Sequence, residues 1–168
     1  HRRYNLNKSM QIYGRLQPFA SDMFEINLSE IKTNIGKNIS SIIMKAMVTA
    51  ESISEFVASD EPPCSEALDP LLTLYDSRGN VILENDDFTA TNLCPSIFSI
   101  LNVQSQGAGE THNPNIYRIQ VQNLSLLTSS YRLQVIFPDS CGNGTLDFGE
   151  ECDSDDMSSC RSCRLVEP

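Results

Sequence analysis

Short runs of alternating apolar and polar residues recur along this 168-residue chain and leave few architectures open. In the clearest run, 116–122, the side chains of Tyr117, Ile119 and Val121 share one face. Such runs, together with a run rich in β-branched residues at 39–49 and an apolar hairpin around the turn at 76–80, predict eight strands. They lie at 10–16, 22–28, 39–49, 71–75, 81–83, 96–103, 116–122 and 131–137. Turn residues separate the runs, and no long helical period is present. We therefore predict an all-β fold, an antiparallel jelly-roll-like β-sandwich.

The charge balance argues against several classes of partner. Twelve Lys and Arg face 22 Asp and Glu, which gives a net charge of −10. Binding to phosphate groups needs a positive field, so we expect no nucleic-acid partner. No apolar run approaches the roughly 20 residues of a transmembrane helix, so we expect no membrane insertion. The chain starts at His1 without a leader sequence, which predicts a processed chain or an excised fragment.

Composition changes along the chain and predicts three parts. Residues 1–9 are polar and basic, and we expect a mobile N-terminal arm. Residues 10–138 hold the predicted strands of the sandwich. From 139 to 168, Cys, Asp, Glu, Gly and Ser dominate, and few side chains are apolar. A segment this short and polar needs crosslinks or a metal ion to fold.

The six cysteines indicate an oxidising compartment. They are even in number, and four fall within the last 28 residues. A zinc site is the competing interpretation, but the chain lacks a second close pair to match Cys160 and Cys163. We predict that all six form disulfides: Cys64, Cys94, Cys141, Cys152, Cys160 and Cys163. The expected bridges are Cys64–Cys94 and, among three possible tail pairings, Cys141–Cys160 with Cys152–Cys163.

Five Asn-x-Ser/Thr sequences exceed the number expected by chance and favour a secreted glycoprotein. The candidate glycosylation sites are Asn7, Asn27, Asn38 and Asn123. The fifth, Asn143, lies in an acidic loop where a metal ion would compete for its side chain.

One hairpin resembles a known family. The segment 69–87, DPLLTLYDSRGNVILENDD, resembles the signature hairpin of bacterial pre-peptidase C-terminal domains. The flanking segments 11–28 and 116–137 resemble the opening and closing strands of that family, so the resemblance covers 10–138. It implies a jelly-roll-like sandwich that is non-catalytic and is attached to secreted proteins as an accessory or adhesive module.

Closely spaced oxygen-bearing side chains in the tail predict a Ca²⁺ site. Asp147, Glu150 and Asp153 are spaced three residues apart, and Asn143 precedes Asp147 by four. Such hard ligands on a tight loop suit Ca²⁺, whereas Mg²⁺ keeps more of its waters. Six acids and no base lie within 147–156, and a cation would offset their repulsion.

The stretch CGNGTLDFGEECD, at 141–153, closely resembles the calcium loop of disintegrin-like domains and short Cys-rich repeats of secreted microbial proteins. The resemblance assigns the side chains of Asn143, Asp147, Glu150 and Asp153 as ligands, with backbone carbonyls from Ser140 and Thr145. Asp147 stands where the disintegrin-like family usually has Glu, and its shorter reach puts bidentate contact in question. Glu151, between two proposed ligands, is expected to face solvent.

The sequence carries no catalytic motif, and we expect that the protein is not an enzyme. Only His1 and His112 are present. A remote alternative is a copper-dependent oxidase, in which the amine and ring of His1 would bind copper together with the ring of His112.

Charge asymmetry favours an extracellular structural protein that self-associates. Residues 1–16 carry four bases and no acid, whereas 139–168 carry eight acids and two bases. We expect a basic arm to dock on an acidic knob, head to tail, in a secreted or cell-surface filament. The alternative is an accessory or adhesive module that binds carbohydrate or protein. The chain has no Trp, so glycan stacking would fall to its five tyrosines: Tyr4, Tyr13, Tyr75, Tyr117 and Tyr131.

Overall fold

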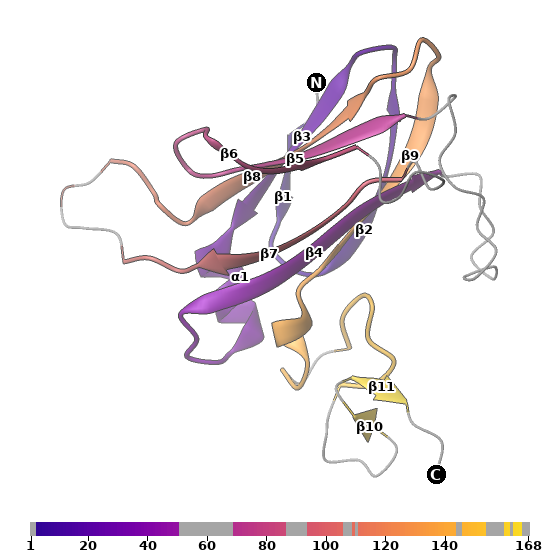
Figure 1. Cartoon of the computed structure of the whole chain (residues 1–168). Helices are drawn as coiled ribbons and strands as arrows, with labels where there is room; N and C mark the ends of the chain where they lie inside the picture. The colour runs from indigo at the N-terminus through magenta and orange to yellow at the C-terminus, as the bar shows by residue number, and fades with distance from the viewer. Residues whose placement is uncertain are drawn as a thin grey trace.

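The computed structural model describes residues 3–50, 69–86, 94–105, 109, 111–143, 146–153, 160–161 and 163–165. Two β-sheets pack face to face, and a small C-terminal module hangs below one end of them (Figure 1). No helix in the described ranges is long and apolar enough to cross a membrane. The predicted β-sandwich is confirmed.

The larger sheet has five strands in the spatial order β1–β3–β8–β5–β6, and the smaller sheet has the order β2–β9–β4–β7. The larger sheet contains β1 (Arg3–Leu6), β3 (Ser21–Asn27), β8 (Ile116–Asn123), β5 (Pro70–Tyr75) and β6 (Val81–Asn85). The smaller sheet contains β2 (Met10–Leu16), β9 (Ser129–Ile136), β4 (Ser41–Ala50) and β7 (Ser96–Asn102). All neighbouring strands are antiparallel except β1 and β3, which are parallel. All eight predicted strands are present.

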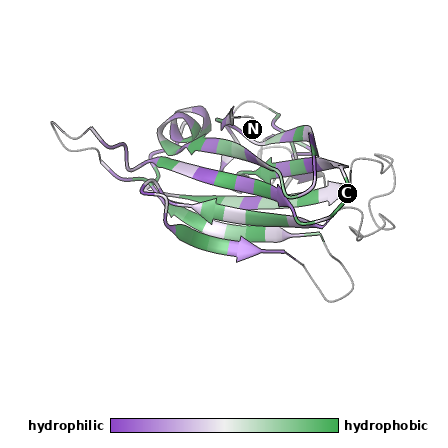
Figure 2. Ribbon diagram, turned by 90° about the horizontal axis from the view of Figure 1, so that it is seen from above, coloured by the Kyte–Doolittle hydropathy of each residue, from purple (hydrophilic) through white to green (hydrophobic). Residues whose placement is uncertain are grey.

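Alternating side chains of both sheets build the core. Phe24, Ile119 and Leu74 lie in register across three strands of the larger sheet and are fully buried. Val48 and Leu133 form a matching buried row on the smaller sheet. Figure 2 shows the resulting alternation of hydrophobic and hydrophilic residues along the strands. The period of two in the sequence therefore follows from the burial of one face of each strand.

One tyrosine links the two sheets through the core. Tyr131 is fully buried, and its hydroxyl donates a hydrogen bond of 2.5 Å to Oδ2 of the buried Asp22. Gly14 lies opposite Tyr131 in the register of β2 and β9. A Cβ at Gly14 would lie 2.5 Å from the Tyr131 ring, so glycine makes room for this aromatic side chain.

A short helix, α1 (Leu28–Ile35), follows β3 directly and is absent from the sequence-based prediction. The Oδ1 atom of Asn27 caps its first turn by accepting the backbone N–H of Ser29 at 3.0 Å. Gly36 ends the helix in a left-handed conformation with φ of 73°. The buried face of the helix consists of Leu28, Ile31 and Ile35, which extends the core at this end.

The N-terminal segment differs from the predicted mobile arm. Arg3–Leu6 form β1, an edge strand of the larger sheet. The Tyr4 ring stacks on Phe24 at a centroid distance of 5.2 Å, and Leu6 is fully buried. Two apolar side chains in four residues therefore hold this segment in the core, although it is too short to show a period.

The three residues 7–9 carry the chain from β1 to β2, and so from the larger sheet to the smaller one. Ser9 is buried, and its Oγ accepts a hydrogen bond of 2.8 Å from the backbone N–H of Phe137. Asn34 on α1 donates from Nδ2 to the carbonyl of Asn7 at 2.7 Å. The crossing is thus fixed by side chains from two other parts of the fold.

Candidate metal centre

The C-terminal module begins where β9 ends, with a short 3-10 turn at Pro138–Ser140. Asp139 in this turn accepts the backbone N–H of Ile43 at 2.7 Å. The Lys37 ammonium donates to the carbonyl of Cys141 at 2.7 Å. These two contacts anchor the start of the module to β4 and to the chain just after α1.

A glycine allows the module to approach the sandwich closely. Gly149 has φ of 90°, and a Cβ there would lie 3.1 Å from Cδ1 of Ile136 on β9. Farther along, β10 (Cys160–Arg161) and β11 (Arg164–Leu165) form a small hairpin that presents Cys163 to the rest of the module.

The disulfide pairing differs from the favoured prediction. Cys141 bonds to Cys163, with a Cα–Cα distance of 5.6 Å, and not to Cys160. Cys163 sits in the turn between β10 and β11 with φ of 60°, and this turn directs its sulfur toward the start of the module. Cys94 and Cys152 are also in disulfides. Cys64 and the side chain of Cys160 lie outside the described parts of the structure.

Four of the predicted ligand residues form one hydrogen-bonded network. Asn143 donates from Nδ2 to Oδ2 of Asp147 at 2.8 Å. Glu150 accepts the backbone N–H of Asp147 on Oε2 at 3.0 Å and the hydroxyl of Ser140 on Oε1 at 3.1 Å. The structure therefore brings these four residues together through hydrogen bonds. Thr145 lies outside the described residues.

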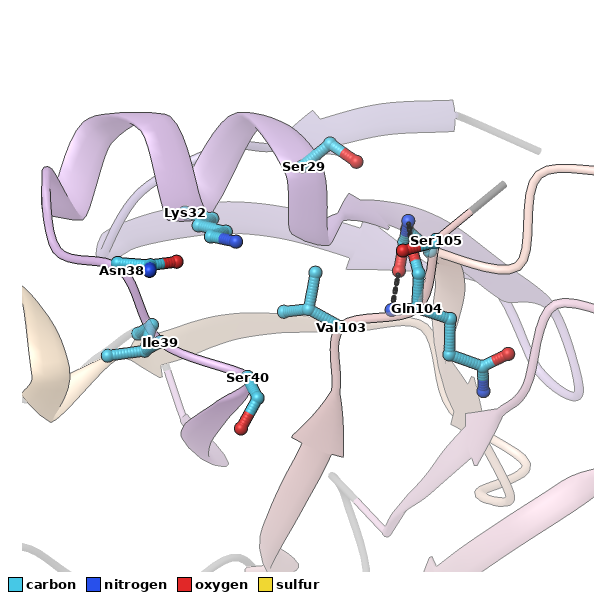
Figure 3. Close-up of a pocket in the computed structure, with 9 residues that line it drawn as sticks. Ser29, Lys32, Asn38, Ile39, Ser40, Val103, Gln104 and Ser105 are labelled. Carbon is cyan, nitrogen blue, oxygen red and sulfur yellow. Dashed lines mark hydrogen bonds between the residues drawn. The ribbon is translucent and has the colours of Figure 1, made fainter. Parts of the chain in front are cut away.

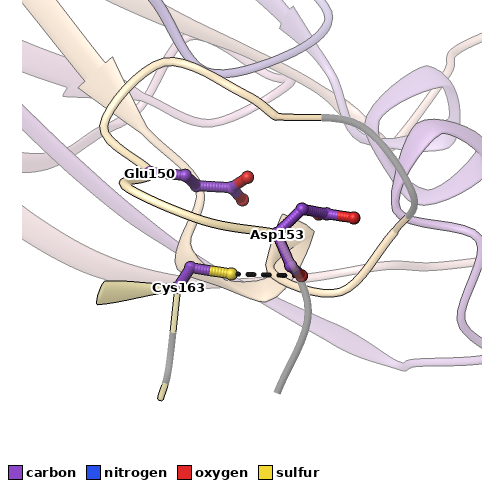
Figure 4. A group of neighbouring side chains, drawn as sticks. All are labelled: Glu150, Asp153 and Cys163. Carbon is purple, nitrogen blue, oxygen red and sulfur yellow. Dashed lines mark hydrogen bonds between the residues drawn. The ribbon is translucent and has the colours of Figure 1, made fainter. Parts of the chain in front are cut away.

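Asp153 is the remaining residue of the cluster, and one of its carboxylate oxygens stands out by its burial. Oδ1 of Asp153 is buried and has no hydrogen-bond partner among the residues that the structure describes. Ligand atoms of Glu150, Asp153 and Cys163 all lie within 4.8 Å of one another (Figure 4). The Cys163 sulfur also lies 3.5 Å from the Asp153 carbonyl oxygen. Because that sulfur is in a disulfide, it has no proton to donate and is not a thiolate ligand.

The cluster therefore offers carboxylate oxygens as possible ligands, and a disulfide lies beside them. Two carboxylates within 4.8 Å repel each other, and one carboxylate oxygen is desolvated without a hydrogen bond. A cation with oxygen preference would relieve both conditions. The proximity of Cys163 carried no signal in the sequence, because it depends on the chain turning back through the β10–β11 hairpin.

The candidate glycosylation sites divide by their surroundings. Asn123 is fully buried, and its Nδ2 donates to the carbonyl of Leu127 at 2.8 Å, so the folded protein has no space for a glycan there. The prediction of a glycan at Asn123 is wrong for this physical reason. Asn38 is exposed, and Asn7 and Asn27 are partly exposed.

The structure places one of the two histidines of the copper alternative. The Nε2 atom of His112 lies 2.9 Å from Oγ of Ser77, in the turn between β5 and β6. His1 lies outside the described residues, so the proposed pairing of the two rings stays a prediction.

A polar hollow of about 570 Å³ lies between α1 and the chain after β7 (Figure 3). The lining side chains are mostly hydroxyls and amides, with the half-buried ammonium of Lys32 on the helix side. On the opposite side, the buried Asn115 uses its amide to bond both backbone groups of Gln104, at 2.6 and 2.7 Å. The described lining contains no carboxylate.

The fold and the site together define a β-sandwich with an acidic, disulfide-closed C-terminal module. No family model matches the sequence, and no curated protein matches it. Among solved structures, the pre-peptidase C-terminal domain of a collagenase from Bacillus anthracis is 12% identical, with a TM-score of 0.49; the likeness covers 80% of this chain and 94% of that domain. A mitogen from Yersinia pseudotuberculosis is 14% identical, with a TM-score of 0.48, over 92% of this chain and 98% of that protein.

Proposed function

We propose that this chain is a secreted, non-catalytic structural protein whose C-terminal module binds Ca²⁺. The observation that carries the proposal is the buried Asp153 oxygen beside Glu150, for which the described part of the chain supplies no hydrogen-bond partner. Native proteins rarely leave a buried carboxylate oxygen without a hydrogen bond, and an ion is one of the usual reasons. Disulfides are typical of proteins in oxidising compartments, which supports an extracellular location.

Calcium suits the donors at this site. The side chains of Asp147, Glu150 and Asp153 supply carboxylate oxygens, and Asn143 supplies an amide oxygen once its amide turns around. The Asn143 nitrogen faces Asp147, and a turn of the amide by 180° would present its oxygen on that side. The backbone carbonyl of Ser140 has room for a second interaction beside the N–H of Asn143.

Calorimetric titration of the purified chain with Ca²⁺, and separately with Mg²⁺, tests the proposal. We expect one Ca²⁺ site and much weaker binding of Mg²⁺. Glu150→Gln should abolish the Ca²⁺ heat. The matched control is Glu151→Gln, which removes the neighbouring exposed acid and should bind Ca²⁺ like the parent chain. Equal Ca²⁺ binding by both variants would contradict the site.

The hollow beside α1 favours a second candidate function, an accessory module that binds a polar ligand. Hydroxyls, amides and one ammonium, without an aromatic platform, suit a hydroxylated ligand with an acidic group, such as a uronic-acid-containing polysaccharide. Retention of the chain on alginate, lost in Lys32→Ala and kept in Lys37→Ala, would support this function. No retention of the parent chain, or equal loss in both variants, would count against it.

A further inference from the structure

The two end strands of the larger sheet, β1 and β6, each leave one edge without a strand partner among the described residues. An open strand edge presents backbone N–H and carbonyl groups that can pair with another chain. β1 and β6 lie at opposite ends of the same sheet, so one copy of the protein offers two different edges in a single plane.

The β6 edge is unusually apolar for one that faces solvent. Val81, Ile82 and Leu83 are consecutive and are 57%, 41% and 37% exposed. Consecutive apolar side chains lie on both faces of a strand, a pattern typical of strands with neighbours on both sides. Soluble proteins usually protect such an edge with charge or proline, but β6 carries only Glu84. Leu83 pairs with Leu74 and Val81 pairs with Tyr75, so Ile82 is the extra residue of a bulge and the β6 ladder is regular from Leu83 to Asn85.

Strand directions make the two edges compatible. β1 runs parallel to β3, and each further step across β8, β5 and β6 reverses direction. β6 therefore runs opposite to β1. A second copy shifted sideways in the same orientation brings its β1 beside β6 as an antiparallel neighbour, which matches the pairing in the rest of the sheet.

The charges near β1 and β6, and the faces on which their apolar side chains lie, also fit this pairing. Residues 3–9 contain two bases and no acid, whereas 81–86 contain two acids and no base. An antiparallel register that places Arg3 opposite Glu84 places Tyr4 opposite Leu83. Leu83 lies opposite the buried Leu74, and Tyr4 packs on the buried Phe24, so both lie on the core side of the sheet. The same register therefore sets a basic position opposite an acidic one and brings the apolar side chains of Tyr4 and Leu83 together on the core side.

We propose that β6 of one copy pairs with β1 of the next, so that the five-stranded sheets join into one continuous sheet. The inference rests on the proposed structural function and names its contact. The two surfaces differ, so the contact is heterologous and repeats without closing unless rotation brings it back to its start. Strand twist accumulates from copy to copy, which gives a twisted ribbon.

Sedimentation velocity over a dilution series tests the contact with two matched variants. Ile82→Lys places a charge on the β6 edge, at a side chain already exposed in the single copy. Ile100→Lys makes the same change on β7 of the smaller sheet, where the side chain is 59% exposed. We expect polymers for the parent chain and for Ile100→Lys, and a monomer for Ile82→Lys. A monomeric parent chain, or polymers in all three, would overturn the proposal.

A charge exchange tests the register. Arg3→Glu and Glu84→Lys should each weaken assembly at least tenfold, and the double variant should restore it. Failure of the double variant while both single variants stay folded by circular dichroism would overturn the register. Calcium titration of the parent chain separates the two proposals: Ca²⁺ binding without assembly refutes the edge contact alone, whereas assembly without Ca²⁺ binding refutes the metal site alone.

Discussion

The absence of a side chain at Gly14 lets the Tyr131 ring pack between the two sheets. The Tyr131 ring occupies the volume that a side chain at Gly14 would need, and its hydroxyl reaches Asp22 on the opposite sheet. We expect Gly14→Ala to lower the free energy of unfolding by about 1–3 kcal/mol, because the ring must move from its hydrogen bond. Urea unfolding would measure the change.

The neighbouring Arg15→Ala is the control for this substitution, since Arg15 is exposed on the same strand. It should change the stability by less than about 0.5 kcal/mol. Equal stability of Gly14→Ala and the parent chain would show that Tyr131 can move without loss.

Asp153 provides a second prediction at the residue scale, one that reverses sign with the metal. In EGTA, Asp153→Asn removes the repulsion with Glu150 and should raise the free energy of unfolding by about 1 kcal/mol. With Ca²⁺ at a hundred times its dissociation constant, the parent chain gains about 2.7 kcal/mol and the variant gains nothing. Thermal unfolding in both buffers measures the reversal; the same order of stability in both buffers would be evidence against a metal ligand here.

At the scale of elements, the turn between β5 and β6 is held by one carboxylate. Oδ1 of Asp76 accepts the backbone N–H of Asn80 at 2.8 Å and that of Arg78 at 2.9 Å. The hydrogen bond from Asn80 is the main cause that lowers the pKa of Asp76 below its usual value, and the Arg78 charge adds to it. Because the folded-state pKa is lowered, the stabilisation is present above the usual Asp pKa and is lost as pH falls through the folded value.

We therefore expect NMR titration to place the Asp76 pKa below 3.8, the ordinary value for this carboxyl group. Asp76→Asn keeps an acceptor oxygen but should remove the acid-dependent part of the hairpin stability. Ser77→Ala, one residue away, should leave the titration of Asp76 unchanged. A normal Asp76 pKa in the folded chain would contradict this account of the turn.

The sequence predicted the elements that depend on alternation and missed those that do not. Most of the eight predicted strands follow from the burial of one face, whereas 71–75 and 81–83 follow from apolar runs on either side of a turn; all eight are present. The helix α1 is only eight residues long, and its start depends on the cap at Asn27, which sequence reasoning assigned to the end of a strand. β1 has four residues, too few to show a period beside polar neighbours.

The candidate site was predictable in composition but not in its contacts. The spacing of Asp147, Glu150 and Asp153 indicated an acidic loop, and the structure brings Glu150 and Asp153 together. The pairing of Cys141 with Cys163 was not predictable, because four cysteines allow three pairings and the spacing alone does not choose among them.

At the scale of the whole molecule, the sandwich and the C-terminal module draw on different sources of stability. The sandwich has a large apolar core, whereas the module has few buried apolar side chains and the Cys141–Cys163 disulfide. Closing a loop with a sequence separation of 22 stabilises the folded module by about 3 kcal/mol in the chain-entropy model. The C-terminal module should therefore unfold before the sandwich does when its disulfides are removed.

We expect the double variant Cys141→Ser, Cys163→Ser to lose Ca²⁺ binding while the sandwich keeps its β-sheet circular dichroism. Tyr131, which packs in the core and not in the module, should keep its near-ultraviolet signal. Peptide mapping of the parent chain should recover Cys141 linked to Cys163. Recovery of Cys141 linked to Cys160 would contradict the structure of the module.

The short crossing at 7–9 has a mechanical consequence. It joins an edge strand of one sheet to an edge strand of the other, and Ser9 ties it to the end of β9 through the backbone of Phe137. A tensile load applied at the N-terminus therefore reaches both sheets within nine residues of the chain. The first two strands, β1 and β2, belong to different sheets, so a pull on the N-terminus that detaches β1 next loads the smaller sheet through Ser9 and β2.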